Sequence, residues 1–299
     1  MALNPPSTGL ASALVLVSSG VWGLFWLPLR HLEDSGVDGV WSAFLLNMPV
    51  ALVLAVVVAL RWDVNRAEFR HAAAIGSVVG LGMGLYAAGL IYSTVLRATF
   101  LFYLVPVWAT LIGIVWLDEK AGLLRWAAIA VGLGGLLLII GQGGGQVPMG
   151  IGDVFAFFSG IFWAIGAAMI KRFDTVRVEG MALFQFLAAG FSALLLGAVA
   201  GVIGPPDLSA MIAGLPVAAA TSILALGPSV IAIFWAQKFL FPGRAGLLMM
   251  SEVLVAALSA SILLPGERMQ GLEWVGAGLI VVACLAEVLL APSDKPHGN

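Results

Sequence analysis

Charged side chains are scarce in this chain, and their scarcity excludes a soluble globular protein. Lysine, arginine, aspartate and glutamate make up 10% of the 299 residues, whereas 61% are hydrophobic and the mean hydropathy is +1.07. In soluble domains about a quarter of the residues are charged. With a net charge of −2, nothing in the composition supports nucleic-acid binding, so we expect no nucleic-acid partner.

Cysteine and histidine are also rare. The single cysteine, Cys284, excludes an intramolecular disulfide and any cysteine metal cluster. His31, His71 and His297 fall in predicted loops or in the tail, and the zinc, nucleophile-elbow and phosphate-loop motifs of enzymes are missing. We therefore expect no enzyme activity, no metal and no cofactor, and an ATP-driven pump would need a separate ATPase subunit.

Long apolar runs are what the chain has instead. About twenty apolar residues cross the roughly 30 Å hydrocarbon core as a helix, and so the sequence predicts an all-α integral membrane protein in the lipid bilayer. The first run has no basic residue before it, which favours a retained helix over a cleaved signal peptide. The ten predicted spans lie near residues 10–29, 39–60, 71–93, 97–117, 123–140, 150–170, 180–203, 215–239, 244–264 and 272–290.

Basic residues alternate between the gaps that separate these runs. The gaps and tail on the same side as the N-terminus hold eleven lysines and arginines, whereas the other gaps hold only Arg30, Arg97 and Arg268. Short cytoplasmic loops carry an excess of basic residues. The sequence therefore predicts that both termini are cytoplasmic.

Two sets of residues recur in the second half of the chain at similar offsets, and they predict two five-helix repeats, 1–145 and 146–299. Because five is odd, the second repeat is inverted in the membrane. Inverted repeats make the inward-open and outward-open arrangements similar in energy, which favours a transporter; the alternative is a duplication preserved in a non-transporting scaffold or sensor. Ser18, Trp22 and Arg30 match Ser159, Trp163 and Lys171, 141 residues later, and Glu119 and Lys120 match Glu267 and Arg268, 148 residues later.

Two tryptophans are predicted near mid-membrane depth. Trp22 and Trp163 lie about eight residues from a helix end, or roughly 12 Å at 1.5 Å per residue. Ser18 and Ser159 stand one turn away on the same faces. Because aromatic belts collect at the interfaces, we interpret all four residues as lining a substrate cavity. Helix packing or lipid contact is the alternative.

Further candidates for the cavity are polar residues inside apolar runs. The hydroxyl of Tyr86 needs a partner if it is buried, and Tyr103 belongs to a stripe of polar and small residues along its helix. Pro106, on that stripe, and Pro228, which precedes Ser229, each remove a backbone hydrogen bond. These prolines predict bending points that could contact an amino or hydroxyl group, or else ordinary packed kinks.

Glu252 is a carboxylate well inside an apolar run. A charge there is costly and is by default functional, either as a proton carrier or as the partner of a cationic group. The alternative is a neutral, hydrogen-bonded glutamic acid in a water-filled vestibule. Glu287, Arg97 and Lys238 lie nearer to predicted helix ends, where we expect their long side chains to reach the interface.

The chain resembles the drug/metabolite transporter superfamily in its EamA-type branch. The resemblance covers nearly the whole chain and is carried by the ten-helix inverted repeat, by the Glu119-Lys120 and Glu267-Arg268 turns, and by the Ser-Gly-Val-Trp-Gly start that contains Trp22. It implies export of a small-molecule substrate across the inner membrane without an obligatory protein partner. The 244–264 run departs from the pattern, because Glu252 and its neighbours stand where a proline would be common.

Within that superfamily the chain looks most like the aromatic amino-acid exporters of the YddG type. This narrower resemblance lies in the mid-membrane tryptophans and tyrosines and in the scarcity of charge. It implies an amino acid with an aromatic or broadly apolar side chain as the substrate, held by aromatic and cation–π contacts. A drug or a cationic metabolite is the alternative substrate.

Overall fold

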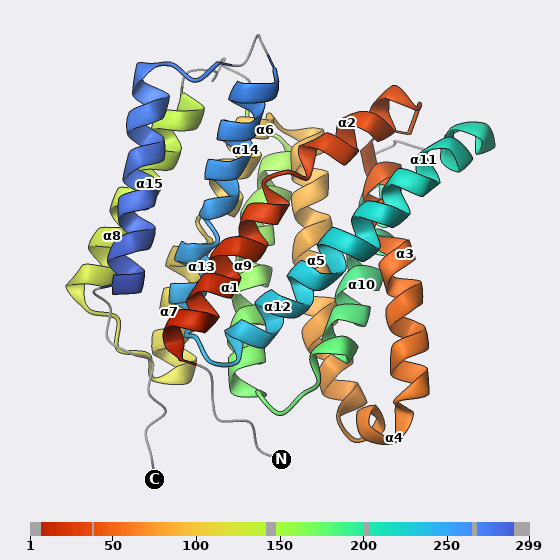
Figure 1. Cartoon of the computed structure of the whole chain (residues 1–299), viewed down its shortest axis with the longest axis horizontal. Coiled ribbons are helices and arrows are strands. Elements are labelled where there is room, and N and C mark those ends of the chain that lie inside the picture. The colour runs from red at the N-terminus through yellow and green to blue at the C-terminus, as the bar shows by residue number, and fades with distance from the viewer. Residues whose placement is uncertain (1–6, 38, 142–147, 200–203, 265–267, 290–299) are drawn as a thin grey trace.

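The computed structural model describes residues 7–37, 39–141, 148–199, 204–264 and 268–289 (Figure 1). Within these ranges, ten helical segments are long and apolar enough to cross a membrane, which confirms the predicted all-α fold with ten spans. The helices are α1 Thr8–Trp22, α2 Trp26–Asp34, α3 Gly39–Leu60, α4 Trp62–Asn65, α5 Phe69–Tyr92, α6 Val95–Phe102, α7 Val105–Leu117, α8 Leu123–Ile140, α9 Ile151–Arg172, α10 Val178–Val199, α11 Leu208–Thr221, α12 Gly227–Gln237, α13 Pro242–Leu248, α14 Ser251–Leu263 and α15 Gly271–Leu289.

The two halves of the chain run in opposite directions through the bundle. In Figure 1, α1 begins at the bottom of the view, where α15 ends, whereas α9 begins at the top. We call the side where α1 begins and α15 ends the basal side, and the opposite side the distal side. Large apolar side chains remain on the outer surface, such as Leu123 at 90% exposure and Val115 at 85%. Such a surface suits contact with lipid tails.

Three of the ten spans divide into two helices near their middle, and a fourth is irregular there. The fourth span divides into α6 and α7 just before Pro106, and the eighth passes through a π-helical turn, Ser222–Leu226, just before Pro228. Both prolines remove a backbone donor. The predicted bending point at Pro106 is confirmed by the break between α6 and α7, and before Pro228 the helix is irregular but continuous. The first span divides after Trp22, and Pro28 follows in the first turn of α2. The ninth divides at Met249 between α13 and α14, without a proline at the break.

Small residues bring the helices close together. A Cβ atom on Gly76 would lie 2.2 Å from the Met181 carbonyl oxygen, and one on Gly80 would lie 2.3 Å from the Gln185 carbonyl oxygen. In lipid, helix association depends on close van der Waals packing rather than on the hydrophobic effect. The glycines of α5 therefore allow the contact with α10.

Gly80→Ala is expected to lower the melting temperature of the purified protein, because the added methyl group overlaps α10 and overpacking costs about 1–3 kcal/mol. Gly134→Ala in α8 is the matched control, since a Cβ there meets nothing within 4 Å. Replacing an unhindered helical glycine by alanine is neutral or stabilising by up to about 1 kcal/mol. Equal melting temperatures for the two variants would contradict the close α5–α10 contact.

Candidate functional site

A cavity of about 720 Å³ lies between the two halves of the chain. Helices α1, α2, α3, α5, α6 and α8 of the first half line it together with α9, α10, α12 and α14 of the second half. Its volume is in the range of small-molecule sites, which is roughly 300–1,000 Å³. The cavity can therefore hold a metabolite of ordinary size.

The cavity is open on the distal side and closed on the basal side. Its wall includes Arg30 and Glu33, both exposed near the distal end of α2, and Val95 at the start of α6. Helices α7 and α13 contribute nothing to its wall. These two helices form the basal halves of the fourth and ninth spans, so a solute in the cavity can reach only the distal side.

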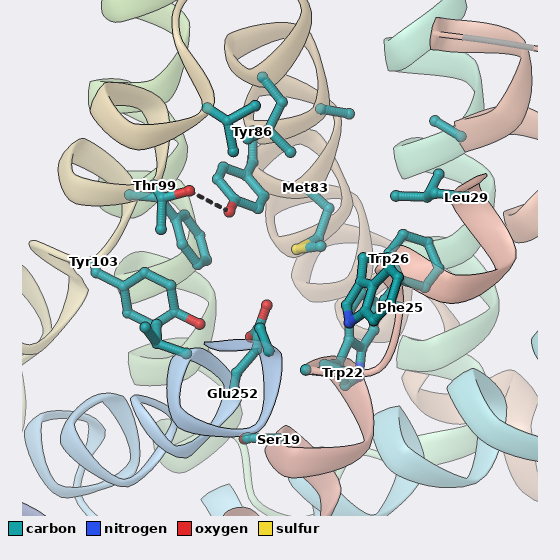
Figure 2. Close-up of a pocket in the computed structure, with 18 of the residues that line it drawn as sticks. Ser19, Trp22, Phe25, Trp26, Leu29, Met83, Tyr86, Thr99, Tyr103 and Glu252 are labelled. Carbon is teal, nitrogen blue, oxygen red and sulfur yellow. Dashed lines mark hydrogen bonds between the residues drawn. The ribbon is translucent and has the colours of Figure 1, made fainter. Parts of the chain in front are cut away.

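Glu252 lies in the first turn of α14, three residues after the break in the ninth span. Figure 2 shows its carboxyl group pointing into the cavity between Tyr103 and Trp22, with the Tyr103 hydroxyl directed toward it. The start of a helix carries the positive end of the helix dipole, which favours a carboxylate there. Broken helices at the membrane midplane commonly form the substrate sites of secondary transporters.

Charge is otherwise confined to the mouth of the cavity. Among the described residues that line it, only Arg30, Glu33 and Glu252 are charged, and the first two are exposed at the distal rim. Tyr86 supplies a hydroxyl that shares a hydrogen bond of 3.3 Å with Thr99 (Figure 2). The deep part of the cavity is therefore an apolar and aromatic site with a single carboxyl group.

Aromatic rings surround that carboxyl group. Trp22 and Phe25 have ring centroids 5.6 Å apart, and Tyr86 stacks on Phe102 at 4.3 Å. Trp163 meets the edge of Phe102 at 6.4 Å. Ring faces attract cations, so this wall suits an ammonium group as well as an apolar side chain.

Two indole N–H groups at the cavity wall lack a hydrogen-bond partner. The Nε1 atoms of Trp22 and Trp163 are buried, and no described residue accepts a hydrogen bond from either. By contrast, Trp26 Nε1 donates to Ser259 Oγ at 3.0 Å and so joins α2 to α14. A buried N–H without a partner costs about 1–3 kcal/mol, so an acceptor that reached either group would be favoured.

Five of the eight predicted site residues line the cavity: Trp22, Trp163, Tyr86, Tyr103 and Glu252. The other three, Ser18, Ser159 and Ser229, are buried but do not line it. Ser18 lies one turn toward the closed basal side. Ser159 is covered by α5, where a Cβ on Gly82 would lie 3.1 Å from the Ser159 carbonyl oxygen, and its hydroxyl donates to the Ala156 carbonyl at 2.5 Å.

Several lining residues carry no signal that sequence reasoning could use. Phe25, Trp26, Met83 and Phe102 are apolar residues in apolar runs and line the cavity only because of how the helices pack. Asn47 is a polar exception, since it lies within a predicted span. Its side-chain amide donates to the Ala43 carbonyl at 2.7 Å, and it also lines the cavity.

Comparison with known proteins identifies the family. The sequence matches the EamA-like transporter family over residues 9–141 and 150–288. The chain belongs to this family. The ten-span fold and the cavity described above are therefore those of a member of the EamA-like transporter family. The division of the repeats between residues 145 and 146 stays a prediction.

Relatives of known sequence are similar over part of the chain. The uncharacterized inner membrane transporter YedA of Escherichia coli K12 and that of Escherichia coli O157:H7 are each 31% identical over 176 residues, or 57% of this chain and 54% of the relative. The chain thus spans about half the length of the curated relatives it matches. Their name states no substrate.

A protein of known crystal structure resembles the whole bundle. The TM-score is 0.69 and the sequence identity 19%, over 94% of this chain and 99% of the other. At this identity the likeness shows the fold alone. The substrate must therefore be inferred from the cavity.

Proposed function

We propose that this transporter exports amino acids with aromatic or other apolar side chains from the cytoplasm, across the inner membrane, by alternating access to the cavity. One observation carries the proposal: the deep cavity combines a single carboxyl group, that of Glu252, with buried indole N–H donors and an aromatic wall. These are the complements of an ammonium group, a carboxylate and an apolar side chain. An apolar amino acid carries all three.

The ammonium group of the substrate would lie between the Glu252 carboxylate and the aromatic rings. Charge-assisted hydrogen bonds to a carboxylate are roughly twice as strong as neutral ones, and the ring faces of Trp22 and Tyr103 add cation–π attraction. The carboxylate of the substrate would accept hydrogen bonds from the indoles of Trp22 and Trp163, which can only donate. This arrangement accounts for the two N–H groups that lack a partner.

The direction of export rests on the distribution of basic residues. If the eleven lysines and arginines of the gaps and tail on the N-terminal side face the cytoplasm, the basal side is cytoplasmic. The structure then corresponds to the state from which the substrate leaves. Rocking of the two inverted repeats about the midplane site would open the basal side and close the distal side.

A drug or cationic metabolite is the second candidate substrate. In its favour, Glu252 is the charged residue deep in the cavity, and the basic residue of the described wall, Arg30, lies at the rim. A cation would need Glu252 but not the indole donors. The two candidates therefore differ in what they require of Trp22 and Trp163.

Counterflow in liposomes tests the proposal. Purified transporter should exchange apolar amino acids such as phenylalanine and leucine saturably, and the corresponding amines, which lack the carboxylate, should compete about tenfold less well, as expected for the loss of charge-assisted hydrogen bonds. Competition by amines alone would replace the amino acid by the cation. If no small solute showed saturable counterflow, a non-transporting scaffold or sensor would be the better description.

A further inference from the structure

Four charged side chains are buried together on the basal side, outside the cavity. Glu119, Arg125, Arg244 and Glu287 each have a side chain no more than 8% exposed. One nitrogen of the Arg125 guanidinium pairs with Glu119, and another lies 2.8 Å from Glu287 Oε1. Arg244 Nε lies 4.0 Å from the same Glu287 oxygen and donates to Ser12 Oγ at 3.2 Å. We call these four charged residues the basal cluster.

The basal cluster joins the two repeats. Glu119 follows α7 and Arg125 lies in α8, both in the first half, whereas Arg244 lies in α13 and Glu287 in α15. Sequence reasoning predicted that Glu287 would reach the interface, and this was wrong. Its side chain is 1% exposed because the end of α15 meets the start of α8, which places Arg125 against it.

The cluster lies beside the helices that close the basal exit. All of α13, Pro242–Leu248, is buried, and it packs against α7. A Cβ on Gly243 would lie 2.3 Å from Thr110 Oγ1, and one on Gly246 would lie 3.2 Å from Pro106 Cα. A solute can leave the cavity basally only if α13 and α7 separate. If the two halves move apart as units, the Arg125–Glu287 contact between α8 and α15 separates with them.

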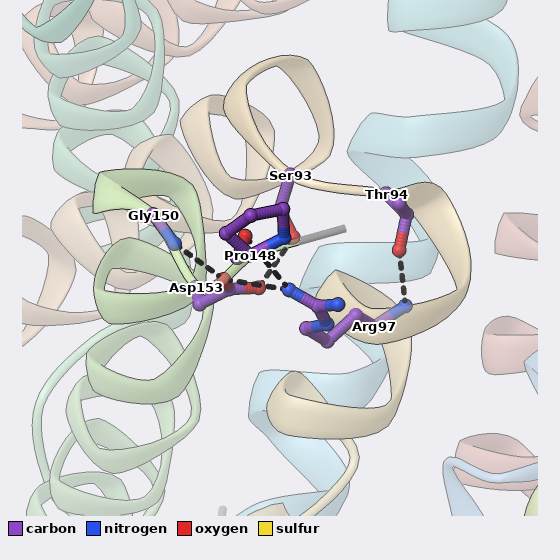
Figure 3. A network of polar contacts seen from close by, with 6 residues as sticks. All are labelled: Ser93, Thr94, Arg97, Pro148, Gly150 and Asp153. Carbon is purple, nitrogen blue, oxygen red and sulfur yellow. Dashed lines mark hydrogen bonds and ion pairs between the residues drawn. The ribbon is translucent and has the colours of Figure 1, made fainter. Parts of the chain in front are cut away.

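The contact between Arg244 and Ser12 has a counterpart on the distal side, the pair Arg97–Asp153 shown in Figure 3. Arg97 follows the start of α6 as Arg244 follows the start of α13, and Asp153 stands 141 residues after Ser12. Arg97 Nη1 lies 3.0 Å from Asp153 Oδ2, and Asp153 also accepts from Ser93 Oγ at 2.5 Å and from the Gly150 N–H at 2.8 Å. The Arg97–Asp153 pair is formed although the distal side is open. A contact of the Arg244–Ser12 kind therefore does not require that its side of the cavity be closed.

Among the residues that the structure describes, the other cluster contacts have no such counterpart. At the offset of 148 that relates Glu119 to Glu267, Arg125 corresponds to Glu273 and Glu287 corresponds to Ile139. On the distal side, Glu273 thus stands in the place of the Arg125 guanidinium. Ile139, which lines the cavity, stands in the place of the Glu287 carboxylate. Closing the distal side therefore does not bring together an arginine and a glutamate at the positions that correspond to Arg125 and Glu287. The two closed states of this inverted repeat differ in their electrostatics.

We infer that the basal cluster is a latch that holds the basal exit shut and biases the resting transporter toward the distally open state. The inference rests on the alternating access proposed above but not on the identity of the substrate. Opening the basal side must separate Arg125 from Glu287 or Arg244 from Ser12, and a buried charge that loses its partner is strongly destabilising. Neutralising the latch should shift the population toward the basally open state.

Thiol labelling tests the latch. In a Cys284→Ser background, which removes the only cysteine of the sequence, a Thr110→Cys reporter lies on α7 beneath α13, where Thr110 is fully buried. Adding Glu287→Gln should raise the labelling rate of the cysteine introduced by Thr110→Cys by about tenfold or more, as expected for loss of a buried ion pair. The matched control is Lys120→Gln, which removes an exposed charge beside Glu119 and should leave the rate unchanged.

A second measurement separates a shift of state from general loosening. Val95 and Leu264 line the distal part of the cavity from α6 and from the end of α14. Spin labels on Val95→Cys and Leu264→Cys should move closer together in Glu287→Gln, because basal opening goes with distal closure. Faster labelling of Thr110→Cys without this shortening, or an unchanged labelling rate, would overturn the inference.

The result stays decisive if one variant folds poorly. Arg125→Gln also removes the latch and should reproduce the effects of Glu287→Gln, whereas Arg125→Lys keeps a positive charge and should label more slowly than Arg125→Gln. The latch would be contradicted if the reporter cysteine were labelled at the parent's rate in both Arg125→Lys and Arg125→Gln. Neither readout uses a substrate, so a failure of amino-acid exchange would be seen separately.

Discussion

Glu252→Gln is expected to reduce exchange of apolar amino acids in liposomes about tenfold and that of the corresponding amines about a hundredfold, since hydrogen bonds to charged groups contribute about 1.5–3 kcal/mol. The substitution keeps the shape of the side chain and removes its charge. An amine then enters an apolar site with an uncompensated positive charge, whereas the ammonium of an amino acid is partly balanced by its own carboxylate. Initial rates of counterflow measure both effects.

Glu33→Gln is the matched control for this prediction. Glu33 also lines the cavity, but it is exposed at the distal rim. Solvent screens charges there, and exposed pairs contribute about 0–1 kcal/mol, so exchange should change by less than about fivefold. If Glu252→Gln exchanged amino acids and amines as the parent does, the carboxyl group would have no part in binding.

Trp163→Phe is expected to raise the KM for amino acids about tenfold and to leave exchange of the corresponding amines unchanged. The substitution keeps an aromatic ring against Phe102 but removes the Nε1–H donor, and a lost hydrogen bond to a charged group costs about 1.5–3 kcal/mol. An amine has no carboxylate to use that donor. Exchange rates measured over a range of substrate concentrations separate the KM from the maximal rate.

Trp108→Phe provides the control for the loss of an indole N–H. Trp108 Nε1 is also buried without a partner among the described residues, but Trp108 does not line the cavity. Its replacement should not alter the KM. If Trp163→Phe raised the KM for amines as much as that for amino acids, the indole would shape the cavity and would not bind a carboxylate.

Much of the fold could be predicted because the signals are local. A membrane span needs only a run of apolar residues, so each of the ten spans could be read from its own stretch of sequence. The break before Pro106 and the irregular turn before Pro228 were predictable for the same reason, since proline removes a backbone donor wherever it stands. The break at Met249 was not, because no residue there forces it and the ninth span departs from the proline pattern.

The candidate site could be predicted in part. Glu252 and Tyr103 stood out because polar groups are rare in apolar runs, and both line the cavity. The serines near Trp22 and Trp163 were placed from the spacing of residues along one helix. That spacing says which residues share a face but not where a neighbouring helix covers it, and α5 covers Ser159.

The sequence by itself determined the membrane class, the number of spans and the inverted duplication, because these depend on composition and order along the chain. Only the tertiary structure decided which side of the cavity is open and which charges meet. Arg125 and Glu287 stand at the ends of different helices in different repeats, and they pair because α8 and α15 pack together. Such contacts, and the conformational balance that they set, depend on the packing of the whole bundle rather than on any local pattern.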